Sequence, residues 1–183
     1  RWNDNQASTG LLHNFRILMT QVDSDYMHYG PNTTSNEALG ATVIYNESEI
    51  FYNVGVHLKG SFVGRDTSRT GFHIKFNDDQ LFRGVHDKVA IDRSQTVSAI
   101  SPTEALIQII GNHAGELPSR YDDLVYVIAP RSAQTSVGHM RLAGWDEIYL
   151  DEQYENGSGG NEFDFETPRW ATATIDGNPQ SIK

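Results

Sequence analysis

The 183-residue sequence has 24 acidic and 14 basic residues, and its formal net charge of −10 argues against the chain as a whole binding nucleic acid. It contains no cysteine, which excludes disulfides, zinc–thiolate sites and thiol catalysis. We expect no membrane span, because no apolar run approaches the roughly 18 residues that a spanning helix needs. The sequence begins at Arg1 rather than Met and shows no signal-peptide core, so we interpret it as an excised or processed fragment.

Apolar and polar residues alternate along most of the chain, which predicts short strands. Residues 1–13 are polar and are expected to form an arm or linker. Turn-forming residues around Gly30-Pro31-Asn32 predict a loop from Ser24 to Leu39. The expected strands follow one another as an antiparallel meander, with a hairpin turn at 46–49, and they are 14–23, 41–45, 50–59, 72–76 and 89–92.

One helix is predicted over residues 102–114 from a complete start signal. Ser101 is the expected N-cap, Pro102 the first helical residue and Glu104 the capping-box residue. Apolar residues recur on one side at helical spacing: Leu106, Ile109 and Ile110. A buried strand is predicted at 123–128, whereas residues 139–149 fit neither period. The predicted fold class is α+β, an antiparallel β-meander sheet with one main packed helix.

Two of the predicted strands alternate apolar with cationic residues. If residues 54–58 pair with residues 72–76, the apolar side chains share one face and four polar side chains share the other: His57, Lys59, His73 and Lys75. This cationic face could hold phosphate groups, as a strand lysine does in kinases. A solvated sheet face whose lysines protect its edge explains the same pattern.

Several acidic residues have both a structural and a functional interpretation. Glu104 suits the helix cap, and it could instead form an ion pair with a strand lysine. Asp92 ends a strand, where functional side chains often emerge, although Asp-Arg-Ser is also a common turn. The acidic stretch 146–166 has ligands suited to calcium or magnesium but no EF-hand spacing, and a solubilising face is the simpler interpretation. No metal site is predicted.

The order of several short motifs resembles the first half of the spore-coat CotH kinase family. Members of that family show a G-x-R-x-R/K-G-x-S strand, a K-S-x-x-I-K-F strand and an L-F-G turn. The similar segments in this chain include 54–61, 71–76, 81–84, 89–94 and 148–153. We therefore interpret residues 14–166 as one CotH-like partial domain, followed by an irregular tail at 167–183.

The resemblance implies an atypical bacterial protein kinase, secreted or coat-associated, with a kinase-like β-rich lobe that uses ATP and Mg²⁺. By motif, Lys59 and Ser61 match the strand that lies over the nucleotide, and Lys75 matches the I-K-F lysine. Glu104 would be the partner of a phosphate-binding lysine, and Glu152 matches the acidic residue of a later strand. A protein substrate and an extracellular or cell-envelope location follow from the same resemblance.

The chain departs from the family pattern on the nucleotide-facing sheet. His57 stands where the family favours Arg, and Gly71-Phe72-His73 replaces the usual lysine-serine pair. The family's catalytic and metal-binding aspartates have no counterpart before Lys183. We therefore expect half an active site, inactive alone and completed by the rest of the parent chain or by another subunit. The alternative hypothesis is a non-catalytic extracellular structural or adhesion module of a multidomain surface protein.

Overall fold

The computed structural model describes residues 12–60, 65, 70–92, 102–114, 122–142, 151, 155 and 159. The chain divides into two compact units, Arg1–Gly144 and Trp145–Lys183. Every helix and strand given below lies in the first unit. None of the helices in these described residues is long and apolar enough to cross a membrane.

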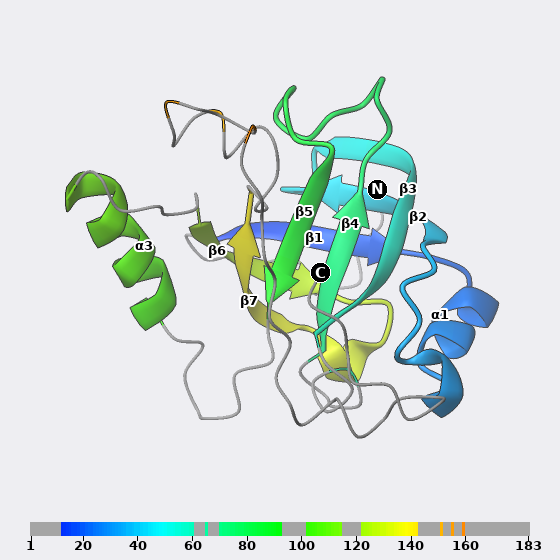
Figure 1. Cartoon of the computed structure of the whole chain (residues 1–183). Coiled ribbons are helices and arrows are strands. Elements are labelled where there is room, and N and C mark those ends of the chain that lie inside the picture. Colours follow the sequence, from blue (N-terminus) through cyan, green and yellow to red (C-terminus); the bar gives the residue numbers. More distant parts are fainter. Residues whose placement is uncertain are drawn as a thin grey trace. The chain divides into compact units, whose positions relative to one another are not determined.

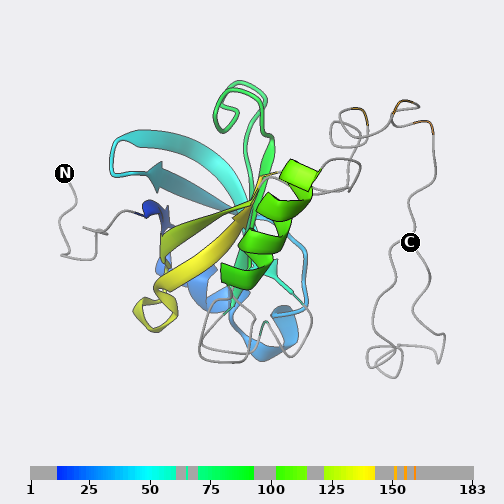
Figure 2. The ribbon, with the colours of Figure 1, turned by 90° about the vertical axis from the view of Figure 1, so that its left-hand side faces the viewer.

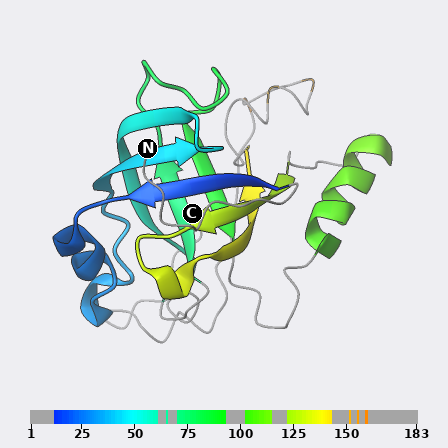
Figure 3. The same ribbon diagram turned by 180° about the vertical axis from the view of Figure 1, so that it is seen from behind.

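Within the described residues, seven strands form one mixed sheet that closes into a barrel (Figures 1 and 3). Around the barrel the order is β1, β2, β3, β4, β5, β7 and β6, and β6 then pairs with β1. That last pairing is parallel, whereas the other neighbours are antiparallel. The strands are β1 (His13–Leu18), β2 (Leu39–Tyr45), β3 (Glu49–Lys59), β4 (Gly71–Lys75), β5 (Lys88–Asp92), β6 (Asp122–Ile128) and β7 (Ser136–Arg141).

The same part of the chain contains two α-helices and two short 3₁₀ helices. α1 (Gln21–Met27) is capped by Thr20, whose hydroxyl oxygen accepts a hydrogen bond from the Asp23 amide at 3.1 Å. α3 (Pro102–Ala114) borders β6 (Figure 2). The 3₁₀ helices are η1 (Gly30–Asn32) and η2 (Ser132–Gln134).

Apolar side chains of the strands fill the interior of the barrel. On β3, Val54, Val56 and Leu58 are at most 1% exposed, and on β4 Phe72 and Ile74 are fully buried. Because side chains alternate along a strand, the polar residues between them lie on the outer face. The face assignment predicted for these two strands is therefore confirmed.

The loop between β4 and β5 contributes an aromatic ring to the core. Phe82 is fully buried, and its ring centroid lies 5.0–5.9 Å from four other rings, those of Phe15, Tyr45, Phe51 and Phe76. Arg83 and Gly84 follow with φ angles of 52° and 75°, which makes a tight turn directly after the buried ring. The Leu-Phe-Arg-Gly motif therefore has a packing role in this fold.

Several predicted elements are confirmed. The predicted hairpin is present as β2 and β3, and the predicted helix coincides with α3. The strands expected at 72–76, 89–92 and 123–128 correspond to β4, β5 and β6.

Two expectations about local structure and pairing are wrong in part. α1 occupies the end of the predicted strand 14–23 and the start of the predicted loop, because a seven-residue helix is too short to show a clear period. β1 to β5 do follow one another as antiparallel neighbours, but the whole sheet is not a meander, since β6 joins β1 in parallel and β7 lies between β5 and β6. The alternation of apolar and polar residues shows which face of a strand is buried, but it does not show which other strand lies next to it in the sheet.

The predicted packing of the helix against the sheet also differs from the structure. Four apolar side chains of α3 are 48–59% exposed: Leu106, Ile107, Ile109 and Ile110. Helical periodicity locates an apolar stripe, and whether another element covers that stripe depends on tertiary structure.

Candidate functional site

Polar and charged side chains of β3, β4 and β5 form a continuous patch on the outside of the barrel, named here the outer face. The strand register pairs His57 with His73, Lys59 with Gly71, and Gly55 with Lys75. Across the next pair of strands, His73 lies opposite Ala90 and Lys75 opposite Lys88. The outer face consists of His57, Lys59, His73, Lys75, Lys88 and Asp92.

An ion pair crosses the outer face between two strands that are not neighbours. Lys59 Nζ on β3 lies 2.8 Å from Asp92 Oδ2 on β5, and the two side chains are only 16% and 15% exposed. β4 runs between them, and at this level its residue is Gly71. A Cβ atom on Gly71 would lie 3.3 Å from Lys59 Cβ and would clash with the Ile91 carbonyl oxygen. The absence of a side chain on Gly71 therefore opens the path along which Lys59 reaches Asp92.

Two histidines stack beside this ion pair. The His57 and His73 ring centroids lie 4.9 Å apart with an interplanar angle of 25°. Burial is the main cause that lowers the pKa of His73 to about 4, and the neighbouring His57 and the positive charges of Lys59, Arg65 and Lys88 contribute to the same shift. Burial is also the main reason why the pKa of His57 is lowered. Both imidazoles are therefore neutral at neutral pH.

Arg65 fixes the chain just beyond β3. Its guanidinium donates hydrogen bonds to the carbonyl oxygens of Gly60, Thr33 and Ser35 and to Asn36 Oδ1, the last at 2.6 Å. These bonds join the segment after β3 to the segment before β2. Arg65 thus adds positive charge near the histidines while its donors hold the backbone.

The structure separates some of the residues that the sequence analysis grouped. Lys75 is exposed and lies four residues along the strand pair from Lys59, about 13 Å at roughly 3.3 Å per residue. Glu104 is on α3, which borders β6, and its side chain lies outside the described residues. Ser61 and Glu152 also lie outside the described residues.

The structure joins other residues whose relationship the sequence analysis missed. Asp92 was predicted as a separate candidate at a strand end, and in the structure it is the carboxylate that pairs with Lys59. The signal that could have indicated this is Gly71 at the start of β4, since a glycine in a strand often marks a close approach of other groups.

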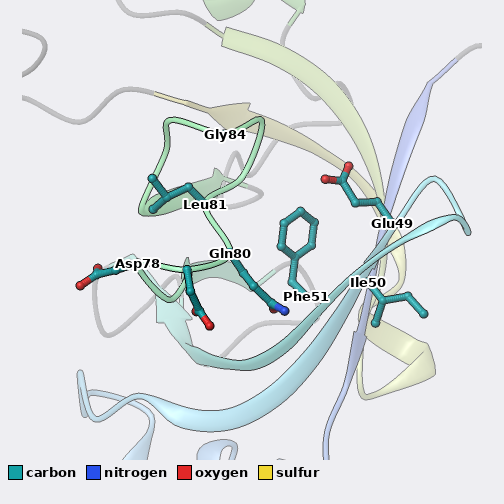
Figure 4. A pocket seen from close by; sticks show the side chains of 8 residues that line it. Glu49, Ile50, Phe51, Asp78, Gln80, Leu81 and Gly84 are labelled. Carbon is teal, nitrogen blue, oxygen red and sulfur yellow. The ribbon is translucent and has the colours of Figure 1, made fainter.

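A second feature, a hollow of about 370 Å³, lies where β3 begins (Figure 4). Its lining includes Glu49, Asp78, Asp79 and the buried Phe51. Gln80 from the same loop accepts a hydrogen bond from the Tyr52 amide at 2.9 Å, which ties the loop to β3. In the part of the chain that the structure describes, no group of three or more His, Cys, Asp or Glu side chains could hold a metal ion. The acidic hollow therefore receives no ligand assignment.

Comparisons with known proteins do not name a family for this chain. No protein-family model matches it, and no curated protein matches it. The outer face is therefore the feature of the molecule from which a function can be inferred.

Proposed function

We propose that the part of the outer face around Lys59 binds phosphate groups, and that the chain is the nucleotide-facing lobe of a CotH-like phosphotransferase. The observation that carries this proposal is the shielded ion pair between Lys59 and Asp92 in a cationic patch of an acidic protein. Lys59 would neutralise phosphate charge, and Asp92 would position its ammonium group.

The ion pair supplies a pre-positioned cation. An ammonium group has three N–H donors, and the 2.8 Å contact with Asp92 uses one of them. Protein kinases also hold a strand lysine on phosphate with a carboxylate, which in their case comes from a helix. In this proposal Asp92, rather than Glu104, is that carboxylate.

The charges around the ion pair fit an anionic ligand. Lys59, Arg65 and Lys88 each contribute to lowering the pKa of His73, so positive potential reaches this part of the outer face. ATP would provide the phosphoryl group when bound, and Mg²⁺ would need ligands beyond the described residues. We assign no catalytic residue in this chain. The proposed phosphotransferase would transfer the phosphoryl group to a protein substrate.

A second candidate function is a non-catalytic extracellular interaction module. The four exposed apolar side chains of α3 favour it, because apolar patches on a surface often mark contacts with other proteins. In that case the cationic outer face would be a solvated surface with no affinity for nucleotide.

Nucleotide binding to the full-length protein separates these functions. Isothermal titration with ATP and Mg²⁺ is expected to show saturable binding, and Lys59→Ala is expected to weaken it on the order of tenfold, the value of a charge-assisted hydrogen bond. Lys75→Ala is the matched control, since it removes an exposed lysine from the same face and is expected to change affinity little. Absence of ATP binding together with absence of phosphate transfer would favour the module. An equal loss of ATP affinity in the Lys59→Ala and Lys75→Ala variants would contradict the proposed role of Lys59.

A further inference from the structure

We propose that His57 and His73 form a two-imidazole binding site for a divalent first-row transition-metal ion, with copper(II) bound most strongly. The site lies on the outer face of the barrel, and its assignment does not rest on the proposed phosphate binding. Neither the spacing of the histidines in the sequence nor the CotH-like motifs predict it.

The strand register brings the two imidazoles together. His57 and His73 are direct partners in the antiparallel pairing of β3 and β4, which places their Cβ atoms about 4.5–5.5 Å apart. Their ring centroids are 4.9 Å apart. One ion at about 2.0–2.1 Å from a nitrogen of each ring can bridge such a pair once the rings turn toward each other. That rotation about χ2 of histidine is soft, because the torsion has broad minima.

A backbone carbonyl already orients one of the two rings. His57 Nδ1 lies 3.0 Å from the Leu58 carbonyl oxygen. Since a carbonyl oxygen only accepts, Nδ1 carries the proton and Nε2 presents a lone pair. Metal-binding histidines are commonly supported in this way through the nitrogen that does not bind the metal. Among the described residues, no hydrogen bond holds the His73 ring in a competing arrangement.

The surroundings select the type of ion. Both histidines are only partly buried, so an ion can enter and water can fill its remaining coordination positions. Arg65 and Lys88 are positive and oppose any cation, and the Lys59 charge is balanced by Asp92. An ion that binds here must therefore gain its affinity from nitrogen coordination, for which copper(II) leads the divalent series and calcium and magnesium are poor candidates.

The test is titration of the full chain with CuCl₂ in a non-coordinating, EDTA-treated buffer, followed by calorimetry and electron paramagnetic resonance. We expect one copper ion per chain with nitrogen hyperfine structure from two imidazoles. Loss of an outer-sphere partner alone weakens metal sites about 10- to 100-fold, so His57→Gln and His73→Gln should each weaken binding at least about tenfold. His113→Gln, which removes an exposed histidine from α3, should leave binding unchanged.

Two further measurements guard against a variant that fails to fold. Circular dichroism checks each histidine variant, and the spectrum of the unmodified chain reports the number of coordinating imidazoles without any substitution. CaCl₂ and MgCl₂ at the same concentrations are expected to release no binding heat at this site. Unchanged copper affinity in a folded variant that carries both His57→Gln and His73→Gln, or a spectrum without two imidazole nitrogens, would overturn the proposal.

Discussion

Lys59 reaches Asp92 across a strand, and the residue of that strand beneath the contact is a glycine. The Nζ to Oδ2 distance is 2.8 Å, although 33 residues separate the partners in sequence. The geometry depends on three neighbouring strands, of which β4 contributes only the backbone of Gly71 at this level. The pair therefore reports on the order and register of the strands as well as on charge.

Gly71→Ala is expected to destabilise the fold by about 2–3 kcal/mol, the cost of forcing an extra carbon into a packed site. The added Cβ would clash with the Ile91 carbonyl oxygen and lie 3.3 Å from Lys59 Cβ. Urea unfolding followed by circular dichroism measures the change. Gly40→Ala is the matched control, because Gly40 also lies in a strand and its added Cβ meets nothing within 4 Å. Equal stability of the Gly71→Ala and Gly40→Ala variants would show that the fold accommodates a Cβ atom at position 71 without strain.

A double-mutant cycle on Lys59→Ala and Asp92→Ala is expected to give a coupling free energy of about 1–2 kcal/mol, within the range for contacting residues. Both side chains are at most 16% exposed, so water screens their attraction only partly. The ion pair between Arg131 and Asp25, with side chains 41% and 59% exposed, is the control and should show a smaller coupling. A coupling for Lys59 and Asp92 no larger than that of the control would indicate a solvated contact.

The faces of β3 and β4 could be predicted from sequence, whereas the ion pair could not. Alternation with a period of two identifies Val56 and Ile74 as inward and His57 and His73 as outward, and this information is local. The partner of Lys59 depends on which strand lies two positions away in the sheet. No local pattern contains that order.

The helices show the same division between local and tertiary information. The capping signals before α3 are contained within a few residues, and they predicted its bounds correctly. The exposure of Ile107 and Ile110 depends on what surrounds the helix, so periodicity alone gave the wrong packing. β7 was missed as a defined strand because the residues from 139 onward fit neither period. Its pairing with β6 is a local hairpin, whereas its place beside β5 depends on pairing across more than forty residues.

Glu47→Ala is expected to cost about 3 kcal/mol, as removal of one partner from a buried ion pair typically does. Arg16 is 1% exposed, and its Nε lies 3.1 Å from Glu47 Oε1, which also accepts a hydrogen bond from Asn14 Nδ2 at 2.7 Å. Thermal unfolding measures the loss. Glu49→Ala removes an exposed carboxylate two residues away and should leave the melting temperature nearly unchanged. Similar melting temperatures for both variants would contradict a structural role for Glu47.

Stability is expected to fall as the pH is lowered from about 6.5 to about 4. The pKa of His73 is about 4 in the folded chain and 6.5 in the absence of the fold, so in this interval the unfolded chain binds the extra proton. Above pH 6.5 both states are neutral at His73, and below pH 4 both are protonated, so its contribution to the slope vanishes on either side. His28 and His57 also have lowered pKa values and add to the slope in the same direction.

The part due to His73 is isolated by comparing the unmodified chain with His73→Gln. Urea unfolding at several pH values, in EDTA to remove metal ions, should show a smaller loss of stability on acidification in the variant. His113→Gln, at an exposed position, should retain the slope of the unmodified chain. If His73→Gln has an unaltered slope between pH 6.5 and 4, the imidazole is protonated in the folded chain as easily as in the unfolded one. In that case burial and the neighbouring charges of Lys59, Arg65 and Lys88 do not hold it neutral.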